Sequence, residues 1–121
     1  MPVIKVWLLP DMEQTQFERL YDALWEGVES VSELGLRVER PQDITFLFPK
    51  DHMQKGLGED GLIEVSQLTP KPERTPEVKQ RLARVLSGVV RAFCPNMKFM
   101  EVFIEEEKPD TTIYTYDKEA E

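Results

Sequence analysis

The chain begins MPVIKVWLLP, and its second residue is the first that could do chemistry. Removal of the initiator methionine, which is normal before a small residue, would leave Pro2 with a free secondary amine. A free α-amine has a pKa of about 7.7 to 8.0, and an apolar pocket or a neighbouring cation lowers that pKa. Such an amine could therefore act as a base near neutral pH. The alternative is structural, because proline is tolerated at the first position of a strand.

The elements that must position this proline recur along the chain. Each of two segments predicts a strand, a helix and a second strand. The first segment places these elements at residues 2–9, 11–34 and 44–48, with Asp11 as the helix N-cap. The second places them at residues 61–68, 76–93 and 100–106, with Thr75 as the N-cap. Residues 2–50 and 61–107 are therefore interpreted as pseudo-repeats within one domain, residues 1–121.

Two βαβ units predict an α+β fold with a four-stranded mixed sheet. Because the crossovers of both units are right-handed, both helices are expected on one face of the sheet. Apolar side chains also alternate onto the other face, among them Trp7, Leu47 and Phe103. A monomer would leave that face exposed, so oligomerisation is expected.

Composition excludes several classes of function. The chain has 121 residues and a formal net charge of -8, without a basic stripe, so nucleic acid is not expected as a partner. Its one cysteine, Cys94, cannot form an internal disulfide, and its one histidine, His52, has no second histidine or cysteine cluster with which to bind a metal. No signal-peptide core and no apolar run of about 18 residues occurs. The sequence predicts a soluble cytoplasmic protein with no membrane partner, no metal and no cofactor.

Three stretches of the sequence resemble the tautomerase superfamily in its fused two-unit form, as in 5-carboxymethyl-2-hydroxymuconate isomerase and macrophage migration inhibitory factor. They are MPVIKVWLL, RPQDITFLFPKD, and PERTPEVKQRL together with FIEEEKPDTTIYTY. The order arginine, threonine, any residue, glutamate ahead of a helix is similar to the helix entry of 4-oxalocrotonate tautomerase. The resemblance covers nearly the whole chain and implies a homotrimer, with an active site at each subunit boundary around the amino-terminal proline. It also suggests that TTIYTY adds an edge strand to a neighbouring subunit.

The resemblance gives the candidate site residues their roles. Pro2 would be the acid-base group that moves a proton in a small unsaturated 2-hydroxy or keto acid, since a single group whose pKa lies near the working pH can serve as both acid and base. Arg74 stands where the resemblance places an arginine that binds the substrate carboxylate, next to a helix start that favours anions. The alternative for Arg74 is a solvated loop arginine.

Two further cations are substrate-binding candidates, because the pattern departs from the family elsewhere. The position equivalent to Arg74 in the first unit is Met12, and a second arginine of the hexameric tautomerases is replaced by Thr45. Arg37, Arg40 or Lys50, from nearby loops, could supply the missing charge, and the alternative for each is a solvated surface charge. Lys5 lies inside an apolar strand, where it could pair with an acid such as Glu64 or reach the sheet edge.

These departures leave a second class of function open. A trimer of the same fold could be a non-catalytic binding module in which Pro2 only begins a strand. Decarboxylation or hydration by the same proline is a third possibility, which the sequence does not separate from tautomerisation.

Overall fold

A computed structural model describes residues 2–7, 11–53, 55–56 and 60–108 of the chain. The elements, in chain order, are β1 (Val3–Trp7), α1 (Gln14–Ser30), η1 (Ser32–Leu34), η2 (Pro41–Asp43), β2 (Thr45–Leu47), β3 (Gly61–Leu68), α2 (Pro76–Phe93) and β4 (Met100–Glu106). The TTIYTY segment, expected to pair with a neighbouring subunit, lies outside the described residues.

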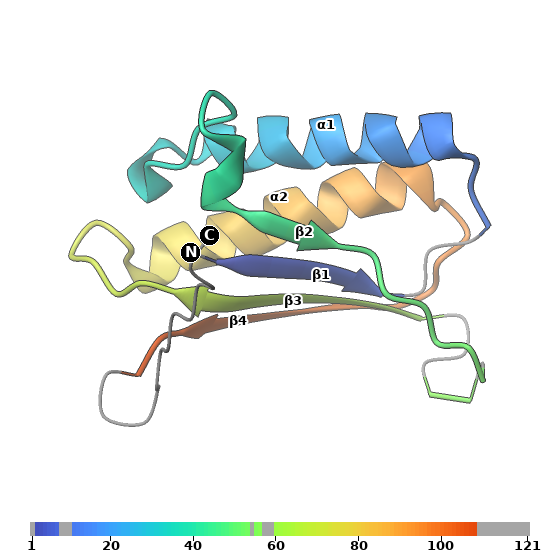
Figure 1. Cartoon of the computed structure of the whole chain (residues 1–121). Helices are drawn as coiled ribbons and strands as arrows, with labels where there is room; N and C mark the ends of the chain where they lie inside the picture. The colour runs from blue at the N-terminus through green and yellow to red at the C-terminus, as the bar shows by residue number, and fades with distance from the viewer. Residues whose placement is uncertain (1, 8–10, 54, 57–59, 109–121) are drawn as a thin grey trace, which may run out of the picture.

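The four strands form one mixed sheet with the order β2-β1-β3-β4. The two central strands, β1 and β3, are antiparallel, and each has a parallel partner from its own half of the chain. Both helices lie on one face of the sheet, as Figure 1 shows. The expected α+β fold with two βαβ units is therefore confirmed.

The core lies between the two helices and the sheet. Alternate residues of the central strands point into it, and one stripe of each helix covers them. Its fully buried members include Ile4, Val6, Ile63, Val65, Leu20, Leu24, Val28, Leu82, Leu86 and Val90. Burying a side chain of this size contributes about 1.5–3 kcal/mol relative to leaving it exposed. This layer fixes the register of β1 and so fixes the position of Pro2.

The start of α1 differs from its prediction. Asp11 was expected to cap the helix, but Glu13 is the N-cap, and Asp11 is exposed and 3.7 Å from the ammonium of Lys50. The reason is a capping box, in which the Gln16 side chain accepts a 3.1 Å hydrogen bond from the Glu13 amide and the Glu13 side chain accepts one from the Gln16 amide.

The end of α1 also differs from its prediction. The helix was expected to continue to Leu34, but it stops at Ser30, whose hydroxyl donates a 2.6 Å hydrogen bond to the Gly27 carbonyl. A short 3-10 turn follows and ends at Gly35, which has a φ of 69°. This left-handed conformation favours glycine and turns the chain back towards the sheet. In contrast, α2 has the predicted bounds and the predicted Thr75 cap.

The face of the sheet that carries no helix is part polar and part apolar. Lys5 lies across from Leu47 on one side and from Glu64 on the other, and Glu64 lies across from Phe103. Leu47 and Phe103 are 44% and 54% exposed. The helix-free face therefore has a charged centre between two exposed apolar side chains.

Candidate functional site

Pro2 lies at one end of the sheet, which we call the proline end. Figure 1 shows β1 beginning where the arrows of β3 and β4 finish and where α2 starts. Pro2 is buried, and its carbonyl accepts a 3.1 Å hydrogen bond from the Thr45 amide. The next residue, Val3, pairs with Thr45 on one side and Ser66 on the other. Two strands thus hold the residue that follows the candidate base.

Arg74 lies in the connection from β3 to α2, and it is buried with 6% of its surface exposed. Its Nη1 donates a 2.7 Å hydrogen bond to the Thr69 carbonyl, and its Nη2 donates a 2.9 Å hydrogen bond to the Leu34 carbonyl. Burial lowers the pKa of the guanidinium, which the carboxylates of Glu73 and Glu106 counteract. An arginine nevertheless stays charged at neutral pH. Arg74 is therefore a charged clamp between the end of the first helical segment and the start of the second.

The expectation that Arg74 is either a ligand or a solvated loop arginine needs one correction. The solvated alternative is wrong, because the side chain is buried and hydrogen-bonded to two backbone carbonyls. Its Nε is also buried and has no hydrogen-bond partner in the part of the chain that the structure describes. A buried charged donor without a partner is costly, so this atom reduces the net stabilisation that the two hydrogen bonds of Arg74 provide.

The start of α2 directly follows Arg74 in the chain. Thr75 is the N-cap, and its hydroxyl accepts a 3.3 Å hydrogen bond from the Val78 amide. Pro76 follows at the first helical position, where its missing N–H costs nothing. The positive end of the helix dipole and the Arg74 charge therefore lie at the same end of the sheet.

Arg40 lies on the connection that enters β2, also towards the proline end. Its side chain is 59% exposed, and its Nε is 3.3 Å from a carboxylate oxygen of Asp43. Ion pairs this exposed contribute about 0–1 kcal/mol, so Asp43 does not hold the guanidinium firmly. Arg40 is therefore an exposed cation at the proline end.

Lys5 lies on the helix-free face, whereas Arg74 lies on the helix side of the molecule. Glu64 is directly opposite Lys5, as expected for a pair. However, Glu64 accepts a 2.7 Å hydrogen bond from the Trp7 indole nitrogen, and within the described ranges no ion pair to Lys5 forms. A single subunit does not bring Lys5 together with Arg74.

Gln67 is a residue of the proline end that the sequence did not single out. It follows Ser66 in β3 and has a φ of 61°, which puts a non-glycine residue in the left-handed region. The sequence holds a partial signal in the alternation, because Ile63 and Val65 are two residues apart whereas the next apolar residue, Leu68, comes three residues later. That break in the period of two indicates a bulge.

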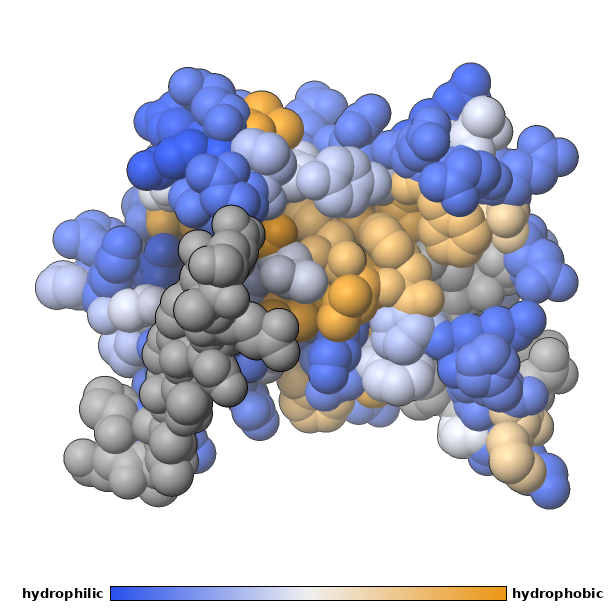
Figure 2. Space-filling view, viewed as in Figure 1, coloured by the Kyte–Doolittle hydropathy of each residue, from blue (hydrophilic) through white to orange (hydrophobic). Residues whose placement is uncertain are grey.

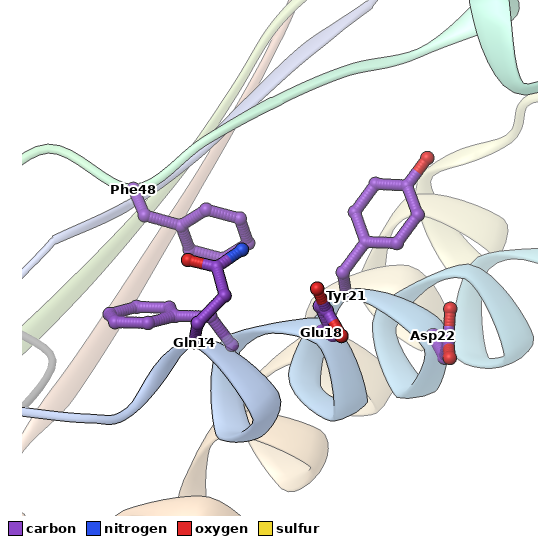
Figure 3. Close-up of a pocket in the computed structure, with 6 residues that line it drawn as sticks. Gln14, Glu18, Tyr21, Asp22 and Phe48 are labelled. Atoms are coloured by element: carbon purple, nitrogen blue, oxygen red, sulfur yellow. The ribbon is translucent and has the colours of Figure 1, made fainter.

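An open groove runs along the first half of α1, and it is distinct from the proline end. Gln14, Phe17, Glu18, Tyr21, Asp22 and Phe48 line it. Figure 2 shows apolar side chains gathered between α1 and the sheet along the β2 edge, and Figure 3 shows the rings of Phe48 and Tyr21 flanking the groove. The rings of Phe17 and Phe48 meet edge to face at 5.7 Å. Its lining includes two carboxylates and no cation, so it does not suit a carboxylate ligand.

Searches for sequence relatives found none: no protein-family model and no curated protein matches this chain. Solved structures do match. The wild-type fused 4-OT asymmetric trimer superimposes with a TM-score of 0.65 over 87% of this chain and 85% of its own, at 19% identity. The chain has the tautomerase-superfamily fold. Malonate semialdehyde decarboxylase matches the same fold over 96% of this chain and 92% of its own, at 18% identity and a TM-score of 0.60.

Two other features are absent from the residues that the structure describes. Within residues 2–7, 11–53, 55–56 and 60–108, no group of three or more histidine, cysteine, aspartate or glutamate side chains is placed to hold a metal ion. Across the same residues, no helix is long and apolar enough to span a membrane.

Proposed function

We propose that this protein is a tautomerase that moves a proton in a small unsaturated 2-hydroxy or keto acid, with the amine of Pro2 as its acid-base group. The observation that carries the proposal is the buried Pro2 at the same end of the sheet as the buried cation Arg74. Burial disfavours the ammonium form of an amine, and a cation at the same end of the sheet acts in the same direction.

Tautomerisation needs one group that first accepts a proton and then donates it. The neutral Pro2 amine takes the proton from the enol oxygen, and the electron pair of that O–H bond forms the ketone. The conjugated double bond then takes the proton from the ammonium onto carbon, which restores the amine. No proton is gained or lost overall, and no cofactor is required.

The neighbouring structures support this chemistry. The decarboxylase is described together with a variant in which its first-residue proline is replaced by alanine, as a basis for decarboxylase and hydratase activities. A further neighbour, 11% identical with a TM-score of 0.63, was inactivated by 2-oxo-3-pentynoate, a 2-oxo acid. An amino-terminal proline and a 2-oxo acid are therefore both associated with this fold.

We assign Arg74 as the carboxylate anchor in this proposal. Its Nη1 and Nη2 each donate to a backbone carbonyl, so the fold sets the plane of the guanidinium before a ligand arrives. The positive charge of Arg74 and the amides at the start of α2 would then attract the carboxylate together. Arg40 supplies a second, surface cation at the same end.

The proposal includes a homotrimer built through the helix-free face. Leu47 and Phe103 are exposed there, and burying them removes apolar area from water. Two wild-type fused 4-OT structures, which share this fold, are trimers. In such an assembly Lys5 lies in the interior, where a partner carboxylate would offset its charge. The groups around a substrate would then come from more than one subunit.

The test is an assay of the protein prepared without an amino-terminal tag, after its intact mass has shown loss of one methionine. Ketonisation of phenylenolpyruvate and 2-hydroxymuconate is expected, with a loss of about 100-fold or more in Pro2→Ala. Circular dichroism of Pro2→Ala should be unchanged, because its substitution removes the ring and not the strand register. Equal rates for both proteins would overturn the proposal.

One observation favours a second candidate function. Arg74 is already hydrogen-bonded to two carbonyls, which is a sufficient structural reason for its presence. A trimeric binding module with an inert Pro2 is the function that follows. It predicts that the processed protein has no ketonisation activity although it forms a trimer in sedimentation experiments.

A further inference from the structure

Gln67 has a backbone conformation that its side chain disfavours. Its φ of 61° lies in the left-handed region, where glycine is tolerated and a residue with a Cβ is strained. Asparagine and aspartate also enter this region more readily than glutamine does. The presence of a glutamine at this position therefore needs an explanation.

The pairing of β3 with β4 explains the bulge, but it does not explain why residue 67 is a glutamine. Val65 pairs with Ile104 and Leu68 pairs with Glu106, so two residues of β3 oppose one residue of β4. The extra residue turns Leu68 into the core, where it is fully buried, and leaves Gln67 exposed. A glycine at position 67 would give the same bulge with less strain, so packing alone does not account for the carboxamide.

The bulge lies at the proline end. Ser66 pairs with Val3, so Gln67 is level with Pro2 across the two central strands. Two residues further along the chain, the Thr69 carbonyl accepts the Nη1 hydrogen bond of Arg74. Gln67 therefore lies in the chain between Ser66, which pairs with Val3, and Thr69, whose carbonyl binds the Arg74 side chain.

We propose that Gln67 is a substrate-binding residue that recognises the oxygen on the second carbon of the substrate. This inference rests on the proposed function. Tautomerisation converts a hydroxyl, which donates a hydrogen bond, into a carbonyl, which only accepts one. A carboxamide offers an acceptor and two donors on one side chain, so it serves both forms without a change of protonation. Strained backbone is found where a side chain must be aimed at a ligand.

The experiment compares two ligands that differ by this oxygen. Binding of 2-hydroxymuconate and of muconate, which lacks the 2-hydroxyl, is measured by calorimetry in Pro2→Ala protein and in Pro2→Ala carrying Gln67→Gly. The preference for 2-hydroxymuconate should fall about tenfold with Gln67→Gly, while the affinity for muconate stays the same. Gln67→Asn, which keeps the carboxamide, should retain part of the preference. Gln80→Ala, at an exposed position of α2, is the control and should leave both affinities unchanged.

The outcomes separate this inference from the proposed function. An unchanged preference in Gln67→Gly, equal losses for both ligands, or no binding of either ligand would each overturn the role of Gln67. The proposed function is judged separately, by whether Pro2→Ala lowers turnover in an otherwise unaltered chain. Thermal unfolding of Gln67→Gly should not be lowered, because glycine relieves the strain at this φ.

Discussion

The two halves of the molecule share an order of elements but differ at the point where each helix begins. In the second half Arg74 precedes the cap of α2 and is hydrogen-bonded to two backbone carbonyls. In the first half the equivalent position is Met12, which packs against the core. The antiparallel pairing of β1 and β3 places these two helix entries at opposite ends of the sheet. Among the described residues, two similar halves therefore give one end with a buried cation and one without.

The comparison indicates which properties a βαβ unit must keep. Both halves keep a parallel strand pair and a helix with one buried stripe, because these build the core. The outer strands are free to differ, and β2 has 3 residues where β4 has 7. The ends of the helices differ as well, and it is these ends that carry the candidate chemistry.

The largest effect on this comparison is expected from Arg74→Met, which gives the second half the residue of the first. The Leu34 and Thr69 carbonyls each lose a charged donor, which should lower the free energy of unfolding by about 2–4 kcal/mol. Urea denaturation measures this loss. The control is Arg84→Met on the exposed side of α2, which should change stability by about 0.5 kcal/mol or less. Equal effects of the two substitutions would show that Arg74 is no clamp.

A smaller effect, of opposite sign in the two halves, is expected at one glycine in each helix. A Cβ on Gly27 of α1 would come within 2.6 Å of the Val85 side chain, so Gly27→Ala should cost about 1–2 kcal/mol despite the better helix propensity of alanine. A Cβ on Gly88 of α2 meets nothing within 4 Å, so Gly88→Ala should gain about 0.5–1 kcal/mol. Thermal unfolding distinguishes the two variants. A higher stability of both would mean that the helices can move apart slightly without loss of stability.

The smallest effect is expected at the helix caps. Thr75→Ala removes the hydroxyl that accepts a hydrogen bond from the Val78 amide, so the free energy of unfolding should fall by about 1 kcal/mol. Thr15→Ala, at an exposed position in the first turn of α1, should have almost no effect, because Glu13 and Gln16 cap that helix. Chemical denaturation of the two single variants tests this difference, and equal losses would contradict it.

The sequence predicted the second half of the fold more accurately than the first. The bounds of β3, α2 and β4 agree with the prediction, because apolar periodicity and the Thr75-Pro76 start coincide there. The start of α1 was predicted wrongly because Asp11 is a good cap by residue type, whereas the actual cap depends on a reciprocal contact between Glu13 and Gln16. In the sequence this contact appears only as a spacing of three residues between a glutamate and a glutamine.

The candidate site could be predicted only in part. Pro2 and Arg74 stand out because of residue type and their place relative to a strand and a helix. The burial of Arg74 depends on the carbonyl of Leu34, 40 positions away in the chain, and local patterns do not contain that contact. Gln67 was missed because a bulge is a property of two paired strands, although the burial of Leu68 follows from it.

The chain has two tryptophans, and the structure puts them in opposite environments. Trp25 is 1% exposed within the core and donates a 3.0 Å hydrogen bond to the Tyr21 hydroxyl. Trp7 is half-buried on the helix-free face and bonded to Glu64. The fluorescence of Trp25 therefore reports unfolding, whereas the fluorescence of Trp7 reports whatever covers that face. If the proposed trimer forms through that face, a Trp25→Phe protein diluted from high to low concentration should show its dissociation as a red shift in emission with no change in helix content.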